Sequence, residues 1–321
     1  MTSESIETIE QFSDLTAVEY FGLVEAVNEN YLFDFRQELA DFQSPGDFCI
    51  ITTGSDGKKE RHIQSKTEFI ILQNAEYSGD LGQEFTAWYE ARSGSSVADV
   101  FDVHSKTGVP EVKRLGQDTL SYAEGNADLV YPDRILNSTF VMGNPELQNQ
   151  ARASVLAEMT DVSDDGRRTR DRIRAQMRQY LRCLEIGYYY KSVVFQVDQP
   201  AQYYDERKET YTLGFKVPGI RTVQRALDVI TIKSLQHQLI SPEEALMLPA
   251  NTVGRLNGLA DAGILRDISG VTKGYEWFLQ QYHLAQETFK ASQVGVSVPF
   301  GLPTFLQHKA AVLQFVESAK G

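Results

Sequence analysis

Two short β-rich runs, joined by a polar loop that opens with a glycine–serine turn, constrain the fold of this chain more than any other feature. The first run, FCIITTGS, ends at Gly54 and Ser55, and the second, EFIIL, covers residues 68–72. Both are rich in the β-branched and aromatic residues that favour strands. The sequence therefore predicts two strands of one sheet with a polar connection between them.

Further elements are predicted around this pair. Residues 5–42 and 80–92 have the apolar spacing of helices, and the alternating run VADVFDVHS, residues 97–105, is typical of a third strand. After about residue 115, amphipathic helical stretches replace strand-like runs. They cover residues 145–160, 164–192, 218–238, 251–265, 271–292 and 303–319. Pro145 and the segment Ser241–Glu244 are typical of helix starts.

We therefore expect an α+β protein with two domains. Residues 1–140 would form an α/β domain, with a small mixed β-sheet, helices and an N-terminal helical extension. Residues 141–321 would form an all-helical domain.

Charge and composition narrow the functional classes. The net charge of −13 disfavours general nucleic-acid binding, because such a surface repels phosphate backbones. The chain has two cysteines, a polar acidic N-terminus and no apolar run near the roughly 20 residues that cross a bilayer. We expect a cytoplasmic protein with no membrane partner.

The segment from Gly54 to Leu72 has the residues for phosphate chemistry. Side chains two positions apart on a strand point to the same face, so Lys66 and Glu68 should share one face beside the glycine–serine turn. On the third predicted strand, Asp102 would share a face with Ala98, Val100 and His104.

This layout resembles the nucleotidyltransferase superfamily of the DNA polymerase β type, in particular the branch of protein-PII uridylyltransferase and glutamine synthetase adenylyltransferase. That branch has a glycine pair, a loop with a glycine, a basic residue and a glutamate, and then Ser-Asp-x-Asp opening the second strand. Aligned without a gap, these positions fall on Gly54, Ser55, Gly57, Lys58, Glu60 and Ser65, with the two metal-binding aspartates at Lys66 and Glu68. The third aspartate of the family falls on Asp102.

Three later blocks extend the resemblance, at residues 131–147, 215–228 and 251–265. The residues that match in the first two are Asp133, Arg134, Gly143, Asn144, Lys216, Gly219 and Arg221. The third, NTVGRLNGLADAGIL, matches a helical Thr-x-x-Arg-Leu run.

The resemblance implies transfer of a nucleoside monophosphate from a nucleoside triphosphate to an acceptor, either a protein or a small molecule, with Mg²⁺ as the cofactor. Gly54, Ser55 and Ser65 would lie at the nucleotide, and Lys58 and Lys66 would face its phosphates. Lys216 and Arg221 would either face the phosphates as well or lie on the surface without a role at the nucleotide. Glu68 and Asp102 would hold the ion.

The sequence departs from the family at the centre of that mechanism. Mg²⁺ needs oxygen ligands, whereas the ammonium group of Lys66 has no lone pair and repels a divalent cation. At about 4 Å and an effective dielectric constant near 20, two unit charges interact by roughly 4 kcal/mol.

Two interpretations stay open. Lys66 takes over part of the electrostatic role of the ions, and transfer continues in weakened form with at most one ion. Alternatively, the chain is a pseudoenzyme that acts as a nucleotide-binding or protein-interaction module.

Overall fold

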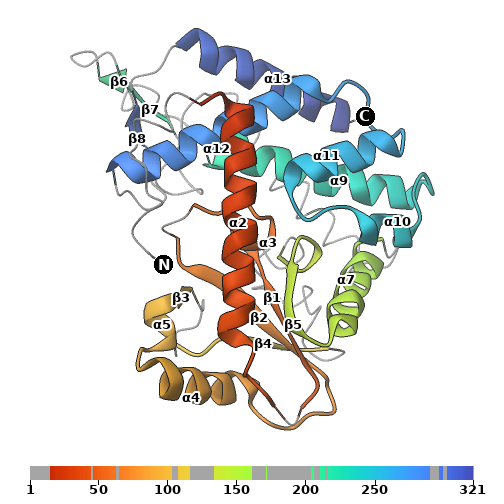
Figure 1. The fold of residues 1–321 in the computed structure, drawn as a ribbon. Helices are drawn as coiled ribbons and strands as arrows, with labels where there is room; N and C mark the ends of the chain where they lie inside the picture. Colours follow the sequence, from red (N-terminus) through yellow and green to blue (C-terminus); the bar gives the residue numbers. More distant parts are fainter. Residues whose placement is uncertain are drawn as a thin grey trace. The chain divides into compact units, whose positions relative to one another are not determined.

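The computed structural model describes residues 15–44, 46–62, 65–102, 108–115, 134–160, 171, 204–205, 210–213, 216–289, 296–298 and 302–320 (Figure 1). The chain divides into two compact units. The first, which we call the sheet unit, comprises Val24–Arg172 and Thr231–Gly258. The second unit comprises Met1–Leu23, Ile173–Ile230 and Leu259–Gly321.

The sheet unit is built on a five-stranded mixed sheet. Strand β1 (Phe48–Thr52) pairs antiparallel with β2 (Thr67–Gln73) on one side and with β5 (Thr139–Gly143) on the other. Two short strands, β3 (Phe101–Asp102) and β4 (Glu111–Arg114), pair parallel with β2. The two strands predicted around the glycine–serine turn are therefore confirmed.

Helices cover both buried faces of β1 and β2. Every residue of β1 is buried, as expected for a strand packed on both sides. Helix α2 (Ala17–Leu39) and helix α4 (Leu81–Ser93) contribute to one aromatic cluster with the strands, and helix α7 (Pro145–Thr160) contacts β1, β2 and β5. The cluster is centred on Phe35, Phe42, Phe69, Phe85 and Phe101.

The predicted strand at residues 97–105 is wrong in its first half. Residues Val97–Val100 form one helical turn, α5, and only Phe101 and Asp102 are paired as β3. Val97 and Phe101 are both buried. Because they are four residues apart, their burial fits a helical turn as well as an alternating strand. Residues 103–107, including His104, lie outside the described residues.

The second half of the chain is not all helical. It contains η2 (Lys216–Arg221), α9 (Thr222–Gln236), α10 (Pro242–Met247), α11 (Thr252–Asp261), α12 (Ser269–Phe289) and α13 (Leu302–Lys320). The second unit also has a three-stranded antiparallel sheet. Its strands are β6 (Tyr204–Asp205), β7 (Thr210–Leu213) and β8 (Val296–Val298). Runs of two to four residues are too short to show a recognisable alternation in sequence.

Most of the predicted helices are confirmed within a few residues of their expected bounds. Helix α7 begins at Pro145, and Ser241 and Glu244 form a reciprocal capping box at the start of α10. The predicted helix at 164–192 lies outside the described residues apart from Asp171. Within the described part of the chain, no helix combines the length and apolar character that a membrane span requires.

Candidate functional site

The turn after β1 lies directly against the carboxylate of Glu68 on β2. The hydroxyl of Thr53 donates a hydrogen bond to Oε1 of Glu68 at 2.9 Å. Gly54 has a φ of +59°, and a Cβ atom there would lie 2.5 Å from Oε2 of Glu68. Position 54 therefore requires glycine, both for its backbone conformation and for the space that Glu68 fills.

A guanidinium group pairs with this carboxylate. Nε of Arg134 lies 3.0 Å from Oε1 of Glu68, and the two side chains are 11% and 17% exposed. Arg134 comes from the segment before β5, the strand on the far side of β1. It belongs to a block that resembles the family, but it was not among the predicted site residues. The sequence signal for Arg134 is its position in this block, ahead of Gly143 and of the helix that begins at Pro145.

The second predicted metal ligand lies beside the first. Asp102 on β3 is the register partner of Glu68 on β2, and its side chain is exposed. Partners on neighbouring strands project to the same face, so the side chains of Glu68 and Asp102 leave the same face of the sheet. Lys66 is also exposed, and its ammonium group donates to the carbonyl oxygen of Ala98 in α5 at 2.7 Å.

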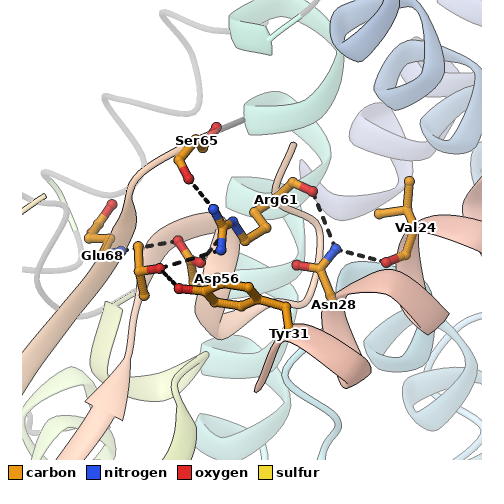
Figure 2. A network of polar contacts seen from close by, with 8 residues as sticks. Val24, Asn28, Tyr31, Asp56, Arg61, Ser65 and Glu68 are labelled. Carbon is orange, nitrogen blue, oxygen red and sulfur yellow. Dashed lines mark hydrogen bonds and ion pairs between the residues drawn. The ribbon is translucent and has the colours of Figure 1, made fainter. Parts of the chain in front are cut away.

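A buried polar network holds the loop between β1 and β2 in place (Figure 2). Nε of Arg61 lies 3.2 Å from Oδ1 of Asp56, and both side chains are almost fully buried. The Arg61 guanidinium also lies 4.0 Å from the ring centroid of Tyr31 on α2. It donates to the hydroxyl of Thr67 at 3.3 Å and to the carbonyl oxygen of Ser65.

The same network fixes the start of β2. The backbone N–H of Glu68 donates to Oδ2 of Asp56 at 3.2 Å, and the hydroxyls of Tyr31 and Thr67 share a hydrogen bond. On α2, the amide of Asn28 donates to the carbonyl oxygens of Arg61 and Val24 (Figure 2). The position of Glu68 therefore depends on contacts made by α2, a helix distant from it in sequence.

Burial changes the acidity of Asp56. Removal from water raises the pKa of this carboxyl to about 7, although the Arg61 guanidinium and the Glu68 N–H act to lower it. Asp56 was not predicted as a site residue, because an acid in a polar loop is ordinarily exposed. Its burial follows from tertiary contacts of Arg61 that the sequence does not reveal.

The remaining predicted residues are distributed over both units. Ser55 and Lys58 lie in and just after the helical turn α3 (Gly54–Gly57), and Lys58 is 4% exposed. Lys216 and Arg221 lie in η2 of the second unit. Their predicted role at the nucleotide stays a prediction.

The residues at this site do not fit the two-ion arrangement of the family. Mg²⁺ takes near-octahedral oxygen coordination, and two ions need several carboxylate oxygens between them. Here Glu68 already binds the Arg134 guanidinium and the Thr53 hydroxyl. Among the described residues, no three His, Cys, Asp or Glu side chains are grouped so that they would hold a metal ion.

Compared with models of known protein families and with curated proteins, the chain has no match. What the structure defines is an α+β protein with a mixed sheet that carries a carboxylate–guanidinium pair beside a glycine–serine turn. The resemblance to the nucleotidyltransferases therefore depends on the sequence blocks and stays a prediction.

Proposed function

We propose that this chain is a nucleotidyltransferase-like pseudoenzyme that binds a nucleotide beside Gly54 and Ser55 without two-metal transfer. In this proposal the positive charge of Arg134 lies next to the carboxylate of Glu68, which would otherwise bind a divalent ion. Positively charged side chains, and not a bound metal ion, would then contact the phosphates of the nucleotide.

The Glu68–Arg134 ion pair is the observation that carries this proposal. With Nε 3.0 Å from Oε1 and both side chains largely shielded from water, the guanidinium occupies one carboxylate oxygen of Glu68 and repels a divalent ion there. Breaking a buried ion pair leaves an uncompensated charge and typically costs about 3–5 kcal/mol. The lysine at position 66 adds a second positive charge next to the same strand.

Weakened nucleotidyl transfer is the second candidate function, and one observation favours it. Glu68 and Asp102 are register partners on adjacent strands, so the two predicted metal-binding positions belong to neighbouring strands of one sheet. In that case the ammonium group of Lys66 would stabilise the negative charge of the phosphates, and transfer would require both Glu68 and Asp102.

Equilibrium binding of nucleoside triphosphates separates the two candidates. We expect ATP, GTP, CTP or UTP to bind the full chain in EDTA with a Kd within about threefold of that in Mg²⁺, and no pyrophosphate to be released. Glu68→Gln should leave this binding intact, because the carboxylate is not a metal ligand in the proposal. Mg²⁺-dependent binding together with pyrophosphate release that Glu68→Gln abolishes would establish the transferase instead. Failure of all four nucleotides to bind would overturn both.

A further inference from the structure

One guanidinium group of the sheet unit joins two parts of the candidate site. Nε of Arg61 lies 3.2 Å from Oδ1 of Asp56, which belongs to α3, the helical turn that contains the glycine–serine pair. Nη1 of Arg61 donates to the hydroxyl of Thr67 at 3.3 Å, and Thr67 is the first residue of β2. A single buried side chain therefore connects the glycine–serine turn to the strand that carries Glu68.

Tyr31 on α2 holds this guanidinium in two ways (Figure 2). The guanidinium carbon of Arg61 lies 4.0 Å from the centroid of the Tyr31 ring, over its face. The Tyr31 hydroxyl shares a hydrogen bond with the hydroxyl of Thr67, the same group that accepts from Arg61. A phenylalanine at position 31 would keep the aromatic face and lose the hydroxyl, and an aliphatic residue would lose both. The position of Arg61 therefore depends on both parts of the tyrosine side chain.

The ion pair between Asp56 and Arg61 extends these contacts to the backbone of Glu68. Oδ2 of Asp56 accepts from the backbone N–H of Glu68 at 3.2 Å, while Oδ1 of the same carboxylate faces Arg61. Both side chains of the ion pair are almost fully buried, so water cannot replace a contact that is lost. A shift of the guanidinium therefore alters the position of α3 and of the first residues of β2, and binding sites tolerate only about 0.5 Å of such movement.

We propose that Tyr31 is a positioning residue: through Arg61 and Asp56 it holds the glycine–serine turn and the start of β2 in the geometry that binds the nucleotide. The ligand in this inference rests on the proposed function, whereas the effect of Tyr31 on the turn and the strand needs no ligand. Tyr31 lies on α2, outside every block that resembles the nucleotidyltransferases, so the resemblance assigns it no role. Its loss should weaken nucleotide binding without removing a group that contacts the nucleotide.

Tyr31→Phe is the test variant, and Tyr89→Phe is its matched control. Tyr89 on α4 is a buried tyrosine of the same unit, and its hydroxyl also bonds a residue of α2, Oε1 of Glu38, at 2.8 Å. This bond is separate from the hydrogen bonds of Arg61 and Thr67. A purely structural role predicts the same result for the loss of either hydroxyl. Thr67→Val removes the partner hydroxyl in a second way, and Thr67→Ser keeps it.

Two measurements on the full chain separate the positioning from the binding. Hydrogen exchange of the Glu68 backbone amide, followed by NMR without nucleotide, reports its hydrogen bond to Asp56. The rate is divided by that of Ile71, a fully buried residue of the same strand, so that a general loss of stability cancels. Calorimetric titration with ATP, GTP, CTP and UTP in EDTA then gives the nucleotide affinity.

We expect Tyr31→Phe and Thr67→Val to raise the relative exchange rate of the Glu68 amide about tenfold and to weaken nucleotide binding about fivefold or more. Tyr89→Phe and Thr67→Ser should change either quantity by less than about twofold. Unchanged relative exchange in Tyr31→Phe, equal effects of Tyr31→Phe and Tyr89→Phe, or raised exchange with unchanged nucleotide affinity would overturn the proposal. Failure of wild type to bind any of the four nucleotides would overturn the proposed function, and the exchange measurement would still decide whether Tyr31 positions the start of β2.

Discussion

Glu68 on β2 and Asp102 on β3 are direct register partners on parallel strands, so their side chains leave the same face of the sheet. Like charges at such a position repel each other, and their negative charge needs a counter-charge. Arg134 supplies one for Glu68 through an ion pair of 3.0 Å. The negative charge of Glu68 is therefore balanced by Arg134, a residue of the same chain.

The coupling between Glu68 and Arg134 should appear in a double-mutant cycle. We expect Arg134→Gln to lower the free energy of unfolding by about 2–4 kcal/mol, because it leaves a largely buried carboxylate without its partner. Glu68→Gln should have a smaller effect, and the double variant should be less destabilised than the sum of the two. Urea unfolding measures all four proteins, and strict additivity would contradict the pairing.

Asp56 should make stability depend on pH. Its pKa in the folded protein is about 7, above the ordinary value of 3.8, so the folded protein holds this proton more tightly than the unfolded chain does. The stabilisation is fully present below about pH 4 and is lost as the pH rises to about 7, by at most about 1.4 kcal/mol per pH unit.

The charges that face Asp56 are those of Arg61 and Glu68, with the Tyr31 hydroxyl close by. Asp56→Asn removes the titrating group together with its ion pair to Arg61, so we expect its unfolding free energy to vary less with pH between 4 and 7 than that of wild type. Urea unfolding at pH 5, 6 and 7 measures both proteins. Parallel pH profiles for the two would contradict the raised pKa.

Two glycines with positive φ provide a matched comparison of strain and steric contact. Gly54 has a φ of +59° and Gly94 a φ of +69°, but only at Gly54 would a Cβ atom meet another group, the carboxylate of Glu68. We expect Gly94→Ala to cost about 1 kcal/mol of unfolding free energy and Gly54→Ala about 1 kcal/mol more. Equal losses by chemical denaturation would show that Glu68 does not lie against the turn.

Several elements of the sheet unit could be predicted from the sequence, because their signals are local, but the strands β4 and β5 are not among them. Strand β1 is a continuous run of strand-forming residues, and α10 begins with a serine, a proline and a glutamate that form a recognisable cap. Helix α5 and the strands β6 to β8 could not be predicted, because each is four residues or fewer. Such short segments do not show a period.

The candidate site could be predicted only in part. Gly54 and Glu68 come from one short segment of sequence, and their contact follows from a strand, a turn and a returning strand. Arg134 is 66 residues from Glu68 along the chain, and Tyr31 is 30 residues from Arg61. Contacts over such separations depend on how helices and strands pack, and a single sequence has no local signal for them.

Binding of Mn²⁺, followed by electron paramagnetic resonance, tests most directly whether Arg134 stands in for a metal ion. The ion pair predicts that wild type binds Mn²⁺ at least about tenfold more weakly than Arg134→Gln, because only the variant lacks the positive charge next to the Glu68 carboxylate. Adding Glu68→Gln to that variant should remove the gain. Tight Mn²⁺ binding by wild type that Glu68→Gln abolishes would contradict the account.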